Sequence, residues 1–182
     1  MKRLLLSALL VPILSIVAIA DIDTNEPDCP VSHEVGFSPN RGSLALILKE
    51  IDAAESEILV AAYSFTSQPI VDALVDAHLR GVAVSIVVNK GSINGNGAKA
   101  RDIEEKGVSI RANTKYAIMH NKFMVIDGHT VETGSFNYSA AAVNRNAENV
   151  LILKCVSSVT DSYKEEFQRL WEESIALPAR VS

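Results

Sequence analysis

The sequence predicts an α/β fold in a single domain, and three observations lead to that prediction. The chain has 182 residues, 48% of them hydrophobic, which is enough for one sizeable core. In the first half, short apolar runs alternate with segments of helical periodicity, a pattern typical of parallel strands with covering helices. In the second half, Asp127-Gly128 separates two apolar runs, which predicts an antiparallel hairpin.

The first half divides into strand, helix, strand, helix and strand. The predicted strands share apolar runs of strand length, and they are residues 31–37, 57–65 and 82–88. The predicted helices share apolar residues at helical spacing, and they are residues 44–54 and 67–79. The glycine-rich segment that follows, residues 89–97, lacks the spacing of a phosphate-binding loop, so we expect a mobile surface loop there.

The second half continues with a short helix and ends with a longer one. The short helix should cover residues 100–107, followed by a strand at residues 108–113. The hairpin should pair residues 120–126 with residues 129–133. A last strand is expected at residues 149–155. The closing helix carries its apolar side chains on one face: Val159, Tyr163, Phe167, Leu170 and Trp171.

The first twenty residues have the features of a secretory signal peptide. Lys2 and Arg3 precede a long apolar stretch, which ends in the small-x-small tripeptide Ala18-Ile19-Ala20. An uncleaved membrane anchor is the alternative, although the apolar stretch is near the lower limit for a span and contains Pro12. We therefore expect a signal peptide at residues 1–20, a flexible mature N-terminus at 21–30 and one folded domain at 31–182. Such a protein would be periplasmic or secreted, without stable membrane association.

The net charge excludes a generic basic nucleic-acid-binding protein. The chain carries a formal charge of −5, and removal of two basic residues with the signal peptide leaves −7. Any site for a polyanion must therefore be local. Five cations near the motif described below are candidates for contacts to a phosphate backbone, with ordinary solvated charges as the alternative for each: Lys90, Lys99, Arg101, Lys115 and Arg145.

Cys29 and Cys155 are the two cysteines of the chain. Export permits a disulfide between them, and we favour that pairing over two free thiols. Two cysteines cannot form a multi-cysteine zinc site, and neither Cys-x-x-Cys nor His-x-x-x-His occurs. We therefore expect no metal.

His120 and Lys122 stand two residues apart in a predicted strand, so their side chains should share one face. The ammonium disfavours protonation of the imidazole and offers a fixed positive charge to an anion. This pair suits a neutral nucleophilic imidazole that attacks a phosphate whose oxygens are held by lysine. It suits a metal cation poorly, because the lysine would repel the ion. Taken alone, a histidine in a strand is more often a hydrogen-bonded core residue.

Further residues complete the candidate site. Ser135 and Asn137 can donate hydrogen bonds to phosphate oxygens, and Gly134 lets the backbone come close. Glu148 could orient the histidine by accepting its second ring proton. Asp127 falls at the hairpin turn, where we expect electrostatic or structural support. The alternatives are ordinary turn residues, or a serine hydrolase, whose Gly-x-Ser-x-Gly motif is absent.

The complete pattern, His120-x-Lys122-x4-Asp127-x6-Gly134-Ser135-x-Asn137, resembles the HKD signature of the phospholipase D superfamily at every defining position. Glu148 also stands where that family places its histidine-orienting acid. The segments YAIMHNKFMVIDG, TGSFNYS, NAENVL and AAYSFTS resemble the short bacterial endonucleases of the superfamily. The likeness covers essentially the whole predicted mature domain.

The resemblance implies a mixed β-sheet sandwiched between helices, with one HKD motif per chain. It implies a phosphodiesterase that cleaves DNA, and RNA as a further candidate, with little sequence preference and without a cofactor. The implied catalytic residues are His120, Lys122, Asp127 and Glu148, with Lys122, Ser135 and Asn137 on the substrate phosphate.

The implied reaction passes through a phosphohistidine and needs a second histidine as acid. Since the chain has one motif, and His33, His78 and His129 lie in no second copy, we expect a homodimer with a shared active site. A phospholipase acting on lipid headgroups is the first alternative. A catalytically silent nucleic-acid-binding module is the second, although binding alone does not need a nucleophile.

Overall fold

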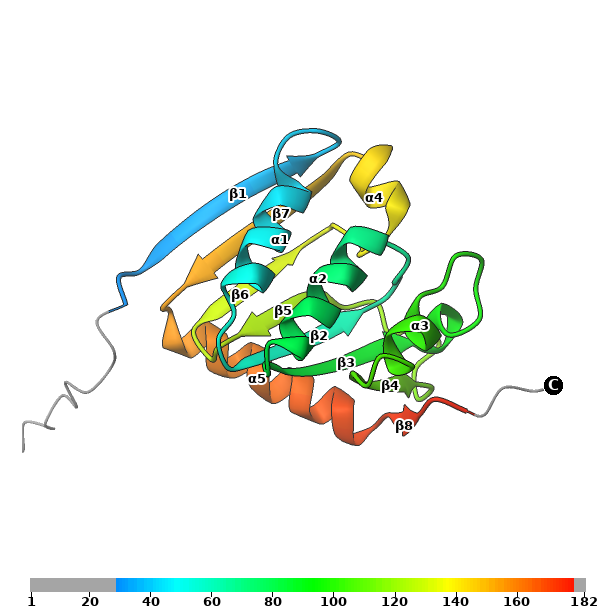
Figure 1. Ribbon diagram of the computed structural model, residues 1–182. Helices are drawn as coiled ribbons and strands as arrows, with labels where there is room; N and C mark the ends of the chain where they lie inside the picture. The colour runs from blue at the N-terminus through cyan, green and yellow to red at the C-terminus, as the bar shows by residue number, and fades with distance from the viewer. Residues whose placement is uncertain (1–28, 179–182) are drawn as a thin grey trace, which may run out of the picture.

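The computed structural model describes residues 29–178, which form one eight-stranded mixed sheet with helices on both faces (Figure 1). The predicted signal peptide and most of the predicted flexible N-terminus lie outside the described residues. The strands are β1 (Ser32–Ser38), β2 (Glu57–Ala62), β3 (Ala83–Asn89), β4 (Ser109–Asn113), β5 (Lys122–Ile126), β6 (Thr130–Gly134), β7 (Glu148–Lys154) and β8 (Ile175–Ala176).

The sheet has the order β1-β7-β6-β5-β2-β3-β4-β8 and combines both kinds of strand pairing. β2, β3 and β4 are parallel neighbours, as the alternation of strands and helices predicts. β5 and β6 pair antiparallel, which confirms the hairpin, and β7 and β1 continue the antiparallel part to the edge. The predicted mixed α/β fold is therefore confirmed.

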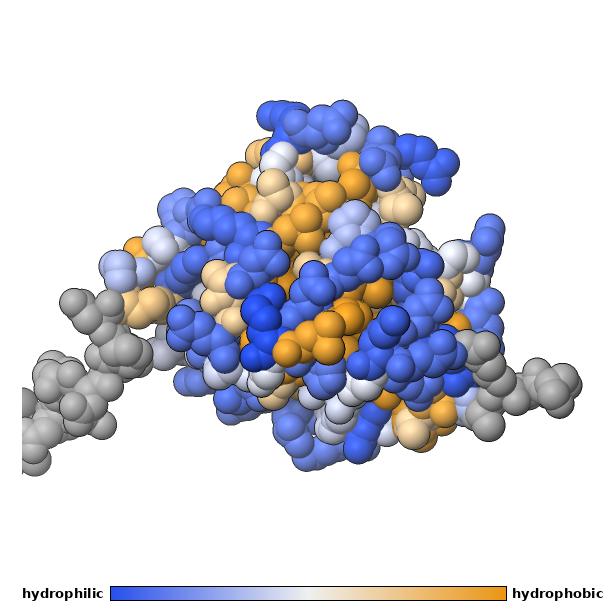
Figure 2. All heavy atoms as spheres, viewed as in Figure 1, coloured by the Kyte–Doolittle hydropathy of each residue, from blue (hydrophilic) through white to orange (hydrophobic). Residues whose placement is uncertain are grey.

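Helices of different length cover the two faces of the sheet. They are α1 (Ser43–Ala53), α2 (Gln68–Leu79), the 3₁₀ turn η1 (Lys90–Ser92), α3 (Ala100–Glu104), α4 (Ala140–Asn144) and α5 (Ser157–Glu172). Figure 1 shows α1 and α2 in front of the sheet and α5 behind it. The larger apolar cluster lies on the α1–α2 side, and a smaller one, with Phe123, Phe167 and Leu170, lies under α5. On the α1–α2 side the surface is mainly hydrophilic, with hydrophobic strips along and between the helices (Figure 2).

Three expectations from the sequence differ from the structure. β1 does not pair with β2 but joins the far edge through β7, so it has no parallel neighbour. β5 begins at Lys122, and His120 lies in the loop before it, exposed to solvent. The glycine-rich segment is only partly a surface loop, because Ser92 and Ile93 are buried and the Ser92 hydroxyl donates to the Tyr63 carbonyl at 2.5 Å. The short elements α4 and β8 have too few residues for a periodic signal.

Within residues 29–178, no helix is both long and apolar enough to cross a membrane.

Candidate active site

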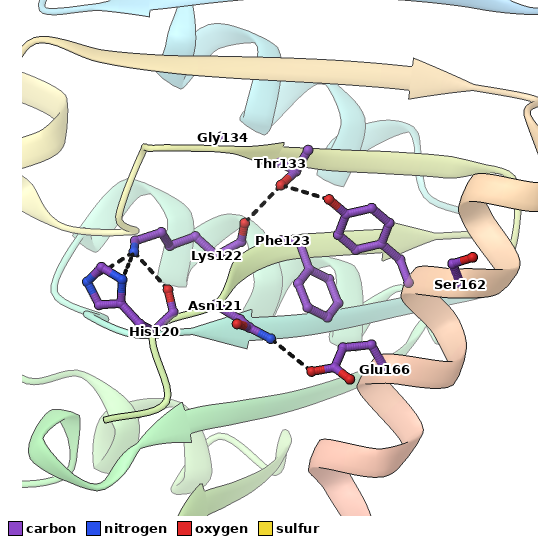
Figure 3. A pocket seen from close by; sticks show the side chains of 9 residues that line it. His120, Asn121, Lys122, Phe123, Thr133, Gly134, Ser162 and Glu166 are labelled. Carbon is purple, nitrogen blue, oxygen red and sulfur yellow. Dashed lines mark hydrogen bonds between the residues drawn. The ribbon is translucent and has the colours of Figure 1, made fainter. Parts of the chain in front are cut away.

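The candidate site lies at one end of the central strands, where β5 begins and β6 ends. His120 stands immediately before β5, and Lys122 is its first residue. The Lys122 ammonium lies 2.9 Å from Nδ1 and 3.2 Å from Nε2 of His120, and it donates to the His120 carbonyl oxygen at 2.8 Å (Figure 3). The Lys122 ammonium has three protons to donate and no acceptor, so in this arrangement it serves the imidazole only as a donor and a positive charge. The two side chains are thus in direct contact, as their spacing in the sequence predicts.

The surroundings of Lys122 lower the pKa of its ammonium group. Partial burial lowers the pKa of the Lys122 ammonium, and the charge of Glu148 raises it by less, so the net pKa is below its usual value. The ammonium thus lies in a partly desolvated place, where its charge acts more strongly on a bound anion than it would in water.

Tyr63 forms one wall of the site and was not predicted as a site residue. Its ring packs against the His120 imidazole with centroids 4.4 Å apart, and the Lys122 ammonium lies 5.5 Å from the centre of the same ring. The Tyr63 N–H also donates to the Asn121 carbonyl at 3.0 Å, which fixes the loop that carries His120. In the sequence Tyr63 belongs to an apolar run, where an aromatic residue indicates a core position rather than a site.

The end of β6 and the turn after it bring Gly134, Ser135 and Asn137 to the same end of the strands. A Cβ at Gly134 would lie 2.1 Å from the Asn149 carbonyl oxygen, so only glycine fits there. Ser135 is exposed, and Asn137 is half-buried, with its side-chain oxygen unpartnered among the described residues. A phosphate oxygen accepts hydrogen bonds, so the side-chain N–H₂ of Asn137, and not this oxygen, would have to make the predicted phosphate contact.

Glu148 contacts Ser135 rather than His120. Its carboxylate accepts from the Ser135 hydroxyl at 2.6 Å and from the Asn146 side-chain amide at 3.0 Å. No hydrogen bond joins it to His120 in the part of the chain that the structure describes. The predicted orienting contact is therefore not made in this geometry, and Glu148 holds Ser135 in the turn after β6 instead.

A cavity of about 480 Å³ opens beside the motif on the α5 side of the sheet (Figure 3). His120 and Lys122 line one end of it, and Phe123 and Tyr163 form an aromatic wall, with ring centroids 4.9 Å apart. The side-chain amide of Asn121 donates to Glu166 of α5 at 3.2 Å across the cavity. The cavity gives a substrate room next to the imidazole.

Asp127 lies at the opposite end of β5 from the other motif residues. The five-residue strand β5, about 17 Å long, lies between it and His120. Its carboxylate accepts from the backbone N–H groups of Glu55, Ser56 and Glu57 at 2.7–3.0 Å, and from the Ser56 hydroxyl at 2.8 Å. Of the two roles considered for Asp127, the structure therefore supports the structural one, since the residue does not reach the catalytic centre.

Replacing Asp127 with alanine should lower stability and leave the chemistry intact. Partial burial raises the pKa of Asp127, but the hydrogen bonds together lower it below the usual value, so the charged form stabilises the fold above about pH 4 and this support is lost as the pH falls. We expect Asp127→Ala to lower the free energy of unfolding by about 2–3 kcal/mol, measured by urea titration at pH 7. The turnover number of the folded variant should stay within about threefold of wild type. A loss of turnover without a loss of stability would return Asp127 to the catalytic centre.

A disulfide joins Cys29 to Cys155, whose Cα atoms lie 5.8 Å apart. It attaches the start of the described chain to the end of β7, at the end of the strands that carries Asp127 and opposite the end that carries His120. The two sulfur atoms and a ring nitrogen of His129 lie within 4.8 Å of one another. Because both sulfur atoms are bonded to each other, they are not available as thiolate ligands in this state.

The structure divides the five candidate cations into two groups. Lys99, Arg101 and Lys115 each form an ion pair with an acidic side chain: Asp102, Glu104 and Glu173 respectively. Lys90 and Arg145 are exposed and have no ion pair within residues 29–178. Lys90 directly follows β3, and Arg145 shortly precedes β7. Both therefore lie at the end of the strands that carries His120. These two cations are the ones free to contact a polyanion.

Comparison with known proteins identifies the family of this fold and site. A family model described as "Cardiolipin synthase, PLD-like domain" matches residues 47–171, more than half of the chain, including the complete motif. The chain belongs to the phospholipase D superfamily. Membership confirms the resemblance seen in the motif.

Two curated relatives illustrate the range of the superfamily. A protein named "Phospholipase D" from Rickettsia bellii is 34% identical over 131 residues, covering 72% of this chain and 65% of the relative. A "Mitochondrial cardiolipin hydrolase" from Xenopus laevis is 30% identical over 145 residues, covering 80% of this chain and 66% of the relative. The chain thus spans just under two thirds of the length of these curated relatives.

A solved structure matches the chain over a larger share of its own length. The phospholipase D family member Nuc from Salmonella typhimurium is 35% identical, with a TM-score of 0.79, and the match covers 82% of this chain and all of Nuc. The fold described above is therefore the superfamily fold in its short form.

Proposed function

We propose that the protein is an exported phosphodiesterase that hydrolyses DNA, and RNA as a second substrate, with little sequence preference. The observation that carries the proposal is the exposed imidazole of His120 beside the Lys122 ammonium at the mouth of an open cavity. An exposed nucleophile in an open site suits a long polymer that must enter from solvent. The structural match covers all of Nuc, so this chain contains a counterpart of that whole short protein, which supports the proposal.

The proposed reaction has two steps. A ring nitrogen of His120 attacks phosphorus and forms a P–N bond, while the bond from phosphorus to the leaving oxygen breaks and an acid gives that oxygen a proton. Water then attacks the phosphohistidine and passes a proton to the same group, and the P–N bond breaks to restore the imidazole. Lys122 and Asn137 neutralise the charge that develops on the non-bridging oxygens.

The acid of the first step is proposed to come from a second copy of the chain. The cavity beside His120 is lined by no other histidine of the described chain. His78 lies in α2 on the other face, His33 in β1, and His129 at the far hairpin turn. A homodimer with a two-fold axis through the site would place two His120 side chains on opposite sides of one phosphorus.

A phospholipase is the second candidate, and the relatives favour it by name. The Rickettsia and Xenopus proteins are called phospholipase D and cardiolipin hydrolase, and the chemistry at phosphorus would be the same. A retained apolar N-terminus would also favour this candidate. The two functions differ in what lies beyond the reacting phosphate, because a polynucleotide continues across the surface and a lipid headgroup does not.

The proposed activity can be tested directly on plasmid DNA, RNA and phospholipid vesicles side by side. We expect the plasmid to be nicked after dialysis against chelator and in excess EDTA, because Lys122 would repel a cation from His120. Vanadate should inhibit as a mimic of pentacoordinate phosphorus. Activity that is lost in EDTA and restored by Mg²⁺ or Zn²⁺ would contradict the mechanism, and cleavage of vesicles alone would favour the phospholipase.

Removing Lys90 and Arg145 should weaken polynucleotide binding without affecting a small phosphodiester. Along the sheet the two cations are separated by four strand spacings, about 19 Å, so one lipid phosphate cannot reach both. The Lys90→Ala/Arg145→Ala variant should bind DNA at least tenfold more weakly, and its salt dependence should fall by about 0.7–0.9 in log–log slope per cation. Fluorescence anisotropy with labelled DNA measures both quantities.

Turnover of bis(p-nitrophenyl) phosphate should stay unchanged in the same variant, because the small ester reaches only the motif. Lys106→Ala is the matched control, since Lys106 is exposed and lies at the opposite end of the strands, just before β4. Equal DNA affinity in wild type and double variant would remove these cations from the substrate path.

A further inference from the structure

Three residues that can bind a metal ion meet at the hairpin end of the sheet, away from the candidate active site. Cys29 lies shortly before β1, His129 directly before β6, and Cys155 directly after β7. These three strands are neighbours in the sheet, so their ends lie side by side (Figure 1). A ring nitrogen of His129 and the two sulfur atoms lie within 4.8 Å of one another. Imidazole nitrogen and cysteine sulfur are ligands that zinc prefers, although no spacing motif marks these distant residues in the sequence.

The backbone holds this cluster together independently of the disulfide. Ser32 of β1 pairs with Lys154, the residue before Cys155. The Cys155 N–H donates to the His129 carbonyl oxygen at 2.8 Å, which ties two of the three residues directly together. Cys29 is three residues from Ser32, so its Cα can move no farther than about 11 Å from the Ser32 Cα. Once the sulfur–sulfur bond is broken, the two thiols and the imidazole therefore stay within reach of one another.

The His129 side chain is already oriented for a ligand. Its Nδ1 lies 3.0 Å from the Thr130 hydroxyl, and its Nε2 has no hydrogen-bond partner among the described residues. Metal-binding histidines generally engage their second ring nitrogen in a hydrogen bond of this kind, which fixes the ring and its tautomer. The imidazole is exposed and both cysteines are half-buried, so a reductant and an ion can reach the cluster from solvent.

The surroundings of the cluster suit a cation. A cavity of about 180 Å³ adjoins it, with room for an ion and a water molecule. Asp127, Ser157 and Thr160 line this cavity, and no lysine or arginine of the described chain does. The nearby Lys154 ammonium is turned away, since it pairs with Glu50 at 2.6 Å. With three protein ligands, the fourth position of a tetrahedral zinc ion is left to water.

We propose that the protein with its disulfide reduced binds one zinc ion between Cys29, His129 and Cys155. A dithiol reductant supplies two electrons and two protons, so the sulfur–sulfur bond becomes two thiols and the dithiol becomes a disulfide. The thiols then release their protons to solvent as the sulfur atoms bond to the ion, and Nε2 of His129 gives it a lone pair. The ion thereby replaces the disulfide as the link between the start of the described chain and the end of β7.

The test compares oxidised protein with protein reduced by a phosphine, which takes oxygen from water and leaves no thiol to compete for the ion. After the phosphine is removed under nitrogen, titration of zinc against a coloured chelator should show one ion per reduced chain, with a dissociation constant below about 1 μM. Oxidised protein should bind none, because its sulfur atoms are bonded to each other and His129 alone is a weak ligand. Cobalt(II) should give the visible absorption bands of a tetrahedral thiolate complex with reduced protein only.

Two histidine variants test the composition of the site. His129→Ala in the reduced form should weaken zinc binding by about 100-fold, because it removes the imidazole ligand. His33→Ala is the matched control, since that imidazole is exposed in β1 and does not belong to the cluster. The thermal midpoint of the reduced protein should rise with zinc concentration, and that of reduced His129→Ala should rise much less.

The outcomes separate the metal site from the proposed function. Reduced protein that binds no zinc would overturn the proposal, and so would equal zinc binding by oxidised protein, which would indicate an ordinary surface site. Equal zinc affinity of reduced wild type and reduced His129→Ala would overturn the assignment of the three ligands. The cluster lies at the opposite end of the strands from His120, so plasmid nicking by the oxidised protein tests the proposed function independently of zinc binding.

Discussion

A trace of wild-type chain refolded with a large excess of His120→Ala chain should lose nearly all of its activity. In the proposed dimer each composite site needs one His120 as nucleophile and the other as acid and base. With excess variant, almost every wild-type chain is held in a mixed dimer that has a single imidazole. Each missing catalytic group of this kind costs about 10²–10⁴-fold in rate, so activity per wild-type chain should fall at least 100-fold. The measurement is plasmid nicking as a function of the mixing ratio.

The matched control uses an excess of His129→Ala chain. His129 lies beyond the far end of β5, close to the disulfide, so its removal takes an imidazole from the chain without touching the site. Activity per wild-type chain should stay constant in this mixture. An affinity tag on one chain shows that mixed dimers form. Constant activity in the His120→Ala mixture, with mixed dimers present, would mean that each protomer carries a complete site.

The strands and helices could be predicted because their signals are local. The apolar runs that became β2 and β3, and the stripe that became α5, each lie within one short segment. The position of β1 could not be predicted in the same way. Alternation along a strand shows which side chains are buried, but it does not identify the neighbouring strand, and β1 pairs with β7, more than a hundred residues later in the chain.

The site shows the same division between local and distant information. His120 and Lys122 are two residues apart, so spacing alone brings them together, and the structure shows them in contact. Ser135 and Glu148 are 13 residues apart, and their hydrogen bond depends on how β6 and β7 pair. Tyr63 directly follows a different strand, β2. Its side chain has no motif of its own, so only the pairing of β2 with β5 places it beside the imidazole.

Glu132 is a buried carboxyl group that the sequence presents as an ordinary hairpin residue. It lies in the middle of β6, only 1% exposed, and accepts a hydrogen bond from the hydroxyl of Tyr138, which is fully buried. The Tyr138 carbonyl accepts the N–H groups of Thr66 and Ser67 at 2.9 and 3.0 Å. Tyr138 thus joins the turn after β6 to the segment after β2, and Glu132 holds it from inside the core.

Burial raises the pKa of Glu132 to about 8, although the hydrogen bond from Tyr138 acts in the opposite direction. In the unfolded chain the carboxyl has its ordinary pKa near 4.5. A carboxyl whose pKa is higher in the folded state binds its proton more tightly there, so its contribution to stability is fully present below about pH 4.5. That contribution is lost as the pH rises, until above about pH 8 a charged carboxylate is left in an apolar core.

Glu132→Gln should remove this pH dependence, because glutamine keeps the shape and the acceptor oxygen without the ionisation. Between pH 5 and pH 9 the wild type should lose about 4 kcal/mol of unfolding free energy from this group, since each unit of pKa shift corresponds to about 1.4 kcal/mol and part of the shift lies outside this range. Urea titrations at pH 5, 7 and 9 should show a steep decline for wild type and for the exposed control Glu172→Gln, and a much flatter course for Glu132→Gln. Because Tyr138 anchors the site, nicking activity of wild type should fall over the same alkaline range, and Glu132→Gln should retain it. Parallel stability curves for wild type and Glu132→Gln would show that Glu132 is already ionised in the folded protein at neutral pH.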